Sequence, residues 1–245
     1  MKKILYITLA TLLIAYLIAY IFYFSDFTRE IPVCEKVEVV IVDSLEKHFL
    51  TEKDIVEQLK KAGLYPLNKK SGEINTYNIE NNLLKNEIIE RAEVVQLTSG
   101  AIKIVISQKM PILRVFNSDG SYFVDKAGRT MPAVLAQAIY VPVASGNIEK
   151  SFALSELYKF ALFLQNDEFW NHQITQIYVR NVNDIEIVPR VGSHRILIGS
   201  LDDFEKKLLH LRLFYEQAIP KVGWDKYSVI NLKYKNQIVC TKKES

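Results

Sequence analysis

Two carboxylates in the stretch DIEIVP, Asp184 and Glu186, are spaced so that they could carry out acid–base chemistry. Side chains two residues apart on a strand lie on the same face of the sheet, and paired carboxylates can act as general acid and base. The alternation with Ile185 and Ile187 also predicts a simpler arrangement, in which the isoleucines point into a core and both carboxylates face solvent. We favour this second interpretation.

The dipeptide Ser193-His194 combines a nucleophile with a base. Neighbouring residues on a strand point to opposite faces, so these two side chains would not meet, and we interpret the pair as a surface turn. Asp202 and Asp203 stand at the start of an apolar periodic segment, where acidic residues favour the amino end of a helix.

The histidines have no spacing typical of a metal site. They are His48, His172, His194 and His210. None belongs to an H-x-x-H, H-E-x-x-H or C-x-x-C arrangement, and the chain contains no G-x-S-x-G, G-x-G-x-x-G or P-loop motif. The sequence therefore predicts no catalytic residue, no cofactor and no metal, and a protein that is not an enzyme.

The amino-terminal stretch ILYITLATLLIAYLIAYIFYF contains no charged residue, whereas 24% of the chain is charged. At about 1.5 Å of rise per residue, a helix over residues 4–24 would be about 31 Å long, which matches the ~30 Å hydrocarbon core of a bilayer. A cleaved signal peptide is the alternative, but the stretch ends without an A-x-A site. Because basic residues favour the cytoplasmic side, Lys2 and Lys3 predict that residues 1–3 lie in the cytoplasm and that the residues after the apolar stretch lie outside it.

Charge and cysteine usage narrow the class of protein. The chain carries 31 basic and 28 acidic residues without a basic cluster, which disfavours nucleic-acid binding. Cys34 and Cys240 are too few for a disulfide framework, and we expect two unpaired thiols. The length outside the apolar stretch suits two modest domains.

The first 80 or so residues after the apolar stretch predict a β-α-α-β-β module. Thr51 can cap a helix that Gly63 ends, and Ser99-Gly100 can form the turn of a hairpin. The predicted strands cover residues 36–43, 92–98 and 101–108, and the predicted helices cover residues 51–63 and 77–85.

Beyond residue 110 the pattern predicts a mostly antiparallel sheet that carries two or more helices, so the fold class is α+β. A hairpin with Gly120 in its turn comes first. Helices are expected at 151–165 and 202–219, and strands at 173–180, 184–189 and 194–199. The chain closes at 226–242 with two strands or one strand bent at Lys235-Asn236.

The closing strand is the predicted binding edge, because unpaired backbone groups at a sheet edge accept another strand. Its alternation places Ile230, Leu232 and Tyr234 on one side and Lys233 on the other. In a simpler interpretation, Tyr234 is a core aromatic with its hydroxyl at the rim.

Over nearly its whole length the chain resembles the FtsQ/DivIB family of bacterial cell-division proteins. The resemblance rests on FLTEKDIVEQLKKAG, DGSYFVDKAGRTMP, YVPVASGNI and INLKYKNQIV, in this order behind one apolar helix. It implies a cytoplasmic tail (1–3), a transmembrane helix (4–24), a POTRA domain (34–108) and a β-domain (109–241).

The resemblance also implies a function. Proteins of this family are divisome scaffolds of the cytoplasmic (inner) membrane that link early and late cell-division proteins at the septum, with most of the chain in the periplasm. Their β-domains bind FtsB-like and FtsL-like bitopic proteins through the last strand region. The matching residues here are Lys233 and Tyr234 in INLKY, and with Ile230 and Leu232 of the same strand they form the predicted partner-binding site.

Two other functions remain open from the sequence. One is a POTRA-bearing membrane protein of an export or envelope-assembly pathway, which usually carries tandem POTRA repeats or a barrel. The other is an anchored periplasmic hydrolase, which needs titratable groups converging in a pocket.

Overall fold

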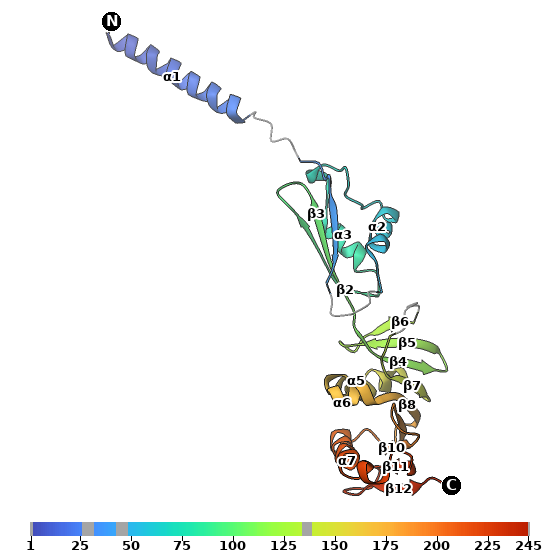
Figure 1. Cartoon of the computed structure of the whole chain (residues 1–245). Helices are drawn as coiled ribbons and strands as arrows, with labels where there is room; N and C mark the ends of the chain where they lie inside the picture. The colour runs from blue at the N-terminus through green and yellow to red at the C-terminus, as the bar shows by residue number, and fades with distance from the viewer. Residues whose placement is uncertain (1, 26–31, 43–48, 134–138, 245) are drawn as a thin grey trace.

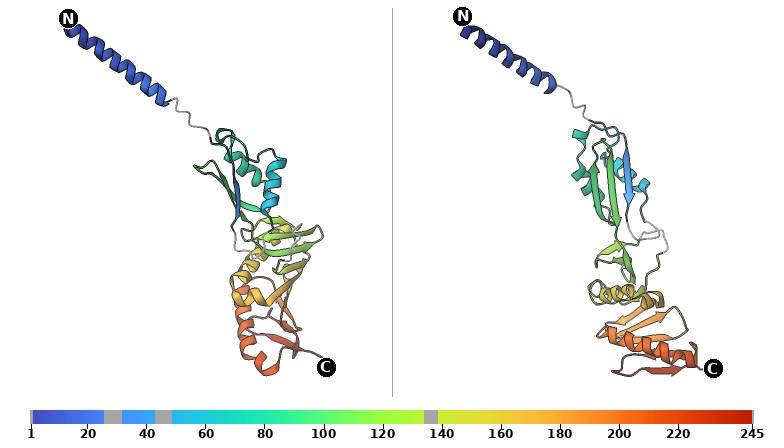
Figure 2. Two further views of the ribbon diagram at one scale, coloured as in Figure 1. Left: turned by 45° about the horizontal axis from the view of Figure 1, so that its top comes forward. Right: turned by 60° about the vertical axis from the view of Figure 1, so that its left-hand side comes forward.

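A computed structural model describes residues 2–25, 32–42, 49–133 and 139–244. The chain begins with one helix, α1 (Lys2–Ser25), and continues into two modules that lie end to end (Figures 1 and 2). Within the described residues, no helix combines the length and apolar character that a membrane crossing requires. The predicted transmembrane helix at 4–24 is therefore not confirmed, although the stretch is helical.

The first module has the predicted β-α-α-β-β order. Its elements are β1 (Val37–Ile41), α2 (Glu52–Lys61), a 3-10 turn (Ser71–Glu73), α3 (Thr76–Leu83), β2 (Ile89–Gln96) and β3 (Ile102–Gln108). The three strands form a sheet in the order β1-β3-β2, with β1 parallel and β2 antiparallel to β3. The predicted strand 36–43 ends at Ile41, and its last residue lies outside the described part of the chain.

Local sequence signals decide where the helices of this module begin and end. Thr51 and Asp54 form a capping box at α2, in which the Asp54 amide donates to Thr51 Oγ1 at 3.3 Å and the Thr51 amide donates to Asp54 Oδ2 at 2.8 Å. The Thr51 hydroxyl also donates to Asp54 Oδ2 at 2.7 Å, and the two hydrogen bonds from the Thr51 amide and hydroxyl lower the pKa of Asp54. Gly63 adopts φ +69° directly after the helix, as predicted.

The second module is a single sheet of nine strands in the order β12-β11-β10-β9-β8-β7-β4-β5-β6. The strands are β4 (Pro111–Asn117), β5 (Gly120–Asp125), β6 (Thr130–Pro132), β7 (Val143–Gly146), β8 (Ile174–Asn181), β9 (Asp184–Pro189), β10 (Arg195–Gly199), β11 (Tyr227–Asn231) and β12 (Val239–Lys242). Five of the eight pairings are antiparallel, which confirms the predicted character of the sheet.

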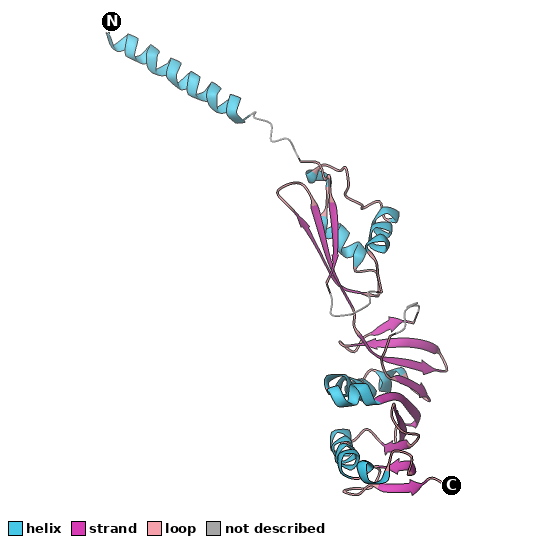
Figure 3. Ribbon diagram, viewed as in Figure 1, coloured by secondary structure: helices cyan, strands magenta, loops and turns pink. Residues whose placement is uncertain are grey.

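Helices cover one face of this sheet (Figure 3). They are α4 (Lys150–Ala153), α5 (Glu156–Asn166), α6 (Glu168–Gln173), α7 (Phe204–Gln217) and α8 (Ile219–Val222). The predicted helix 151–165 is split between α4 and α5, and the short helix α6 was not predicted. On α7 the apolar residues at helical spacing face the core, where Leu208, Leu211 and Tyr215 are buried.

Each module has its own hydrophobic core. In the second module, alternate residues of the central strands point beneath the helices, including Ile177, Ile185, Ile187, Ile196 and Ile230. In the first module, α2 and α3 bury Ile55, Leu59, Ile79 and Leu83 against the small sheet. Among the described residues, no helix lies on the opposite face of the large sheet (Figure 3).

Candidate partner-binding surface

The predicted binding strand lies inside the sheet and is not its edge. β11 pairs in parallel with β10 through Arg195, Ile196 and Leu197, and antiparallel with β12 on its other side. The chain reverses between β11 and β12 at Lys235-Asn236, where Asn236 takes φ +60°. β12 is therefore the edge strand, and the prediction that the 230–234 segment forms the edge is wrong.

Ile230 and Leu232 are core residues. Both are buried, and the Leu232 amide donates to the carbonyl of Leu197 at 2.9 Å, which extends the pairing with β10 past the end of β11. The predicted alternation holds for Ile230 and Leu232, whose side of the strand faces the helices, but not for Tyr234, which is exposed beyond the end of β11 at Asn231. Both stabilise the strand next to the edge, and Leu232 also lines the pocket beside Tyr234.

Lys233 is held against the uncovered face of the sheet by an ion pair. Its Nζ lies 2.5 Å from Asp184 Oδ1, and its amide donates to Asn231 Oδ1 at 2.9 Å. Hydrogen bonds from Lys233 and Arg180 lower the pKa of Asp184. Lys233 therefore ties the segment after β11 to β9.

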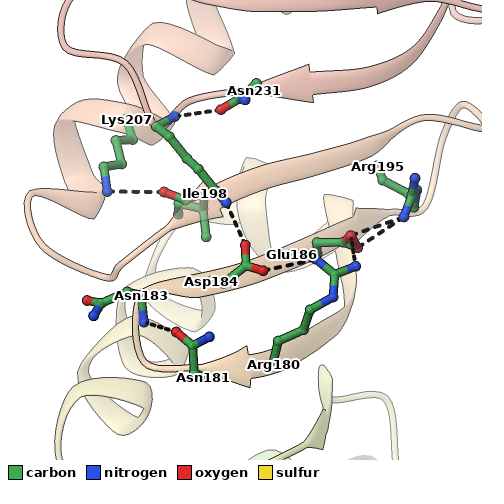
Figure 4. Close-up of polar contacts among 10 residues, drawn as sticks. Arg180, Asn181, Asn183, Asp184, Glu186, Arg195, Ile198, Lys207 and Asn231 are labelled. Atoms are coloured by element: carbon green, nitrogen blue, oxygen red, sulfur yellow. Dashed lines mark hydrogen bonds and ion pairs between the residues drawn. The ribbon is translucent and has the colours of Figure 1, made fainter.

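Glu186 continues the same network. Arg180 donates to Glu186 Oε1 at 2.7 Å and Arg195 donates to it at 3.1 Å, while the other guanidinium nitrogen of Arg180 reaches Asp184 at 3.1 Å (Figure 4). Glu186 is only 4% exposed, so the expectation of a solvated carboxylate was wrong for this residue. Carboxylates already paired with arginines are poor proton acceptors, and this arrangement does not support acid–base catalysis.

Tyr234 is the exposed member of the predicted site. It is 53% exposed, and it follows directly after the pinned Lys233. Tyr234 and the following residues 235–238 line a pocket of about 330 Å³, whose other wall comes from the start of α7, including Lys206 and His210. The interpretation of Tyr234 as a core aromatic is wrong, because its ring lies at the surface.

β12 offers an unpaired edge beside this pocket. It pairs with β11 from Val239 to Lys242, and the sheet order places no strand on its other side among the described residues. Val239 is 41% exposed, while Cys240 and Ile238 are half-buried against the core. An added strand would find free backbone groups on β12 and partly covered apolar side chains beside them. Of the two alternatives for residues 226–242, the one with two strands separated at Lys235-Asn236 is confirmed.

Ser193 and His194 do not form a nucleophile–base pair. Ser193 Oγ donates to Asp225 at 3.3 Å, whereas His194 is buried, with Nε2 at 2.7 Å from the Tyr215 hydroxyl and its ring stacked on Trp224. The prediction that their side chains diverge is confirmed. His194, however, lies in the core, so the surface turn was wrong for this residue.

The described residues contain no cluster of His, Cys, Asp and Glu that could hold a metal ion. His48 lies outside the described part of the chain. Cys34 is buried in the first module and Cys240 is half-buried in β12, and both are free thiols, as predicted. Burial raises the pKa of Cys240.

Two family models match the chain, and their boundaries fall at the junction of the two modules. Residues 110–241 match the family described as FtsQ/DivIB, C-terminal related, and residues 32–107 match a POTRA-like domain. The chain belongs to the FtsQ/DivIB family. A comparison with curated proteins found no match. The first module is accordingly a POTRA-like domain, and the second is the β-domain of this family.

The buried His194 makes the stability of the β-domain depend on pH. Burial lowers its pKa, so the unfolded chain binds a proton near pH 6.5 and the folded chain does so only at lower pH. Below about pH 6.5 the free energy of unfolding should therefore fall, with a slope of at most about 1.4 kcal/mol per pH unit. Both tryptophans, Trp170 and Trp224, lie in the β-domain, so the tryptophan fluorescence of the chain reports its unfolding.

The matched variants are His194→Gln and His210→Gln, because His210 is exposed on α7. We expect the first to flatten the pH dependence between pH 7 and 5 and the second to keep it. An unchanged slope in His194→Gln contradicts the assignment.

Proposed function

We propose that this protein is a non-enzymatic scaffold of the bacterial divisome that docks other division proteins outside the cytoplasm. The observation that carries the proposal is the succession, on one chain, of a POTRA-like domain and an FtsQ/DivIB-related β-domain. The paired carboxylates of the β-domain support this reading, because they brace the sheet with arginines and lysine.

The proposed docking site is β12 together with Tyr234. Its partners would be FtsB-like and FtsL-like bitopic proteins, one of which would add a strand along Val239–Lys242. Backbone hydrogen bonds from such a strand give affinity, while neighbouring side chains give specificity. Tyr234 and the pocket beside it supply an aromatic contact next to the edge, and Lys233 keeps the Tyr234 backbone in place.

We further propose that α1 anchors the protein in the cytoplasmic membrane, with Lys2 and Lys3 on the cytoplasmic side and most of the chain in the periplasm, at the division septum. In support, residues 4–24 lack charge, and apolar side chains around the helix are exposed, including Leu9, Leu13, Ile14 and Leu17. A helix that is apolar on all sides needs an apolar environment, which lipid supplies.

Anchoring predicts how α1 variants partition in cell fractionation. Leu13→Arg with Leu17→Arg should move the protein from the membrane pellet toward the soluble fraction after alkaline extraction, because each charge costs about 2.5–3.5 kcal/mol at a helix centre in the membrane. Leu209→Arg with Leu213→Arg changes two exposed leucines with the same spacing on α7 and is the control. Extraction of the unmodified protein by alkali would argue against the anchor.

Depletion of the protein tests its role in the cell. Cells of the source organism should continue to elongate and form filaments without septa, and expression of the full chain should restore division. Normal septation during depletion would refute the divisome role, whichever surface the protein uses.

Strand addition predicts where backbone amides become protected. In hydrogen–deuterium exchange of the full chain in detergent, the extracytoplasmic segments of the FtsB-like and FtsL-like proteins should slow exchange along β12. The opposite edge, β6, should exchange as before. Tyr234→Ala should weaken binding by about 1–2 kcal/mol, and Tyr140→Ala, at a tyrosine that is 88% exposed, should not. Protection at β6 without protection at β12 would remove the proposed site.

A further inference from the structure

The turn between β5 and β6 contains a buried carboxylate that fixes an arginine at the junction of the two domains. Asp125 is 1% exposed and accepts hydrogen bonds from the amides of Ala127 (3.0 Å) and Arg129 (2.7 Å) and from Arg129 Nε (2.8 Å). A buried carboxylate requires such partners. Arg129 is thereby held on the β-domain side through both its backbone and its side chain.

The same guanidinium also reaches the other domain through Nη2, which lies 2.8 Å from Asp125 Oδ2 as well. Arg129 donates to Oε1 of Glu90, a residue of β2, at 3.0 Å. Glu90 lies within the POTRA-like match and Arg129 within the β-domain match. The hydrogen bond with Asp125 is the main reason why the pKa of Arg129 is raised, and the hydrogen bond with Glu90 raises it further. One cation is therefore shared by a carboxylate from each domain.

Other contacts hold the covalent link between the domains in place. β3 ends at Gln108 and β4 begins at Pro111, so Lys109 and Met110 alone connect them. The Lys109 amide donates to Ile88 at 2.9 Å, and the Lys126 amide donates to Met110 at 2.7 Å. Both ends of this short link are thus fixed, and the turn that carries Arg129 lies directly beside it.

We infer that Arg129 is a positioning residue that fixes the angle between the POTRA-like domain and the β-domain by bridging Asp125 and Glu90. The turn itself is anchored to the β-domain, since the Tyr158 hydroxyl on α5 donates to the Lys126 carbonyl at 3.0 Å. A rotation between the domains would separate Arg129 from Glu90 and leave the Asp125 contacts intact. The angle matters because the two domains lie end to end, so that it determines where β12 stands relative to the POTRA-like domain (Figure 2).

The exposure of the Arg129–Glu90 ion pair determines how strongly its loss should change the orientation of the domains. Arg129 and Glu90 side chains are about half exposed, and exposed ion pairs change an equilibrium by about 1.5- to 5-fold. Glu90→Lys places a like charge against Arg129, so it should change the orientation of the domains more than Glu90→Gln does. Neither variant removes a core contact, so the unfolding midpoint should change little.

The test uses the full chain in detergent micelles and measures a distance between the two domains that changes with the angle. Spin labels are attached at Asn81→Cys on α3 and Gln217→Cys on α7, both exposed, in a background where Cys34 and Cys240 are replaced by Ala. Pulsed electron paramagnetic resonance should give a distance distribution that becomes broader or shifts in Glu90→Lys, and to a smaller degree in Glu90→Gln.

Glu93→Lys is the matched control, because Glu93 lies on the same strand and pairs with Arg91 in its own domain. It should keep the parent distribution. A Glu90→Lys distribution identical to the parent overturns the inference, and so does equal broadening in Glu93→Lys. Partner protection along β12 is measured separately, so failure here leaves the docking proposal standing.

Discussion

The pairing of β12 with β11 determines how the β-domain can act. An open sheet must end in a strand whose outer amides and carbonyls have no partner in the sheet, and here that strand has only four residues, Val239–Lys242. β11, by contrast, is satisfied on both sides and carries the core residue Ile230. The backbone groups without a partner in the sheet therefore lie on β12, one strand beyond the segment 230–234 that the sequence pattern predicted as the edge.

A network of charges stabilises the segment that leads to this edge. Asp184 and Glu186 are bound by Arg180, Arg195 and Lys233, so ion pairs link β8, β9, β10 and the segment after β11 on the face that carries no helix. Because Glu186 is buried, loss of either arginine would leave a poorly paired charge there, which is costly. The same network explains why carboxylates with a spacing suited to catalysis are structural in this protein.

The two domains are joined by a short link and by one shared cation. Arg129 is committed to Asp125 within the β-domain and offers its remaining donors to Glu90 across the junction. The contacts with buried Asp125 hold the Arg129 side chain in place, and the contact of its Nη2 with Glu90 sets the orientation of the domains. A scaffold that presents an edge strand to partners benefits from such control, since strand addition depends on where the edge points.

The sequence by itself determined the local elements and the family. The capping box at Thr51 and Asp54, the left-handed Gly63, and the apolar alternation of Ile185 and Ile187 are encoded by neighbouring residues, so periodicity and turn chemistry predicted them correctly. The tertiary structure alone decided which strand became the edge and that Ile230 and Leu232 would face the helices. It also decided that Glu186 would be buried between two arginines. These outcomes depend on strand order and on contacts between residues distant in sequence, and a pattern along one strand contains no information about which strands flank it.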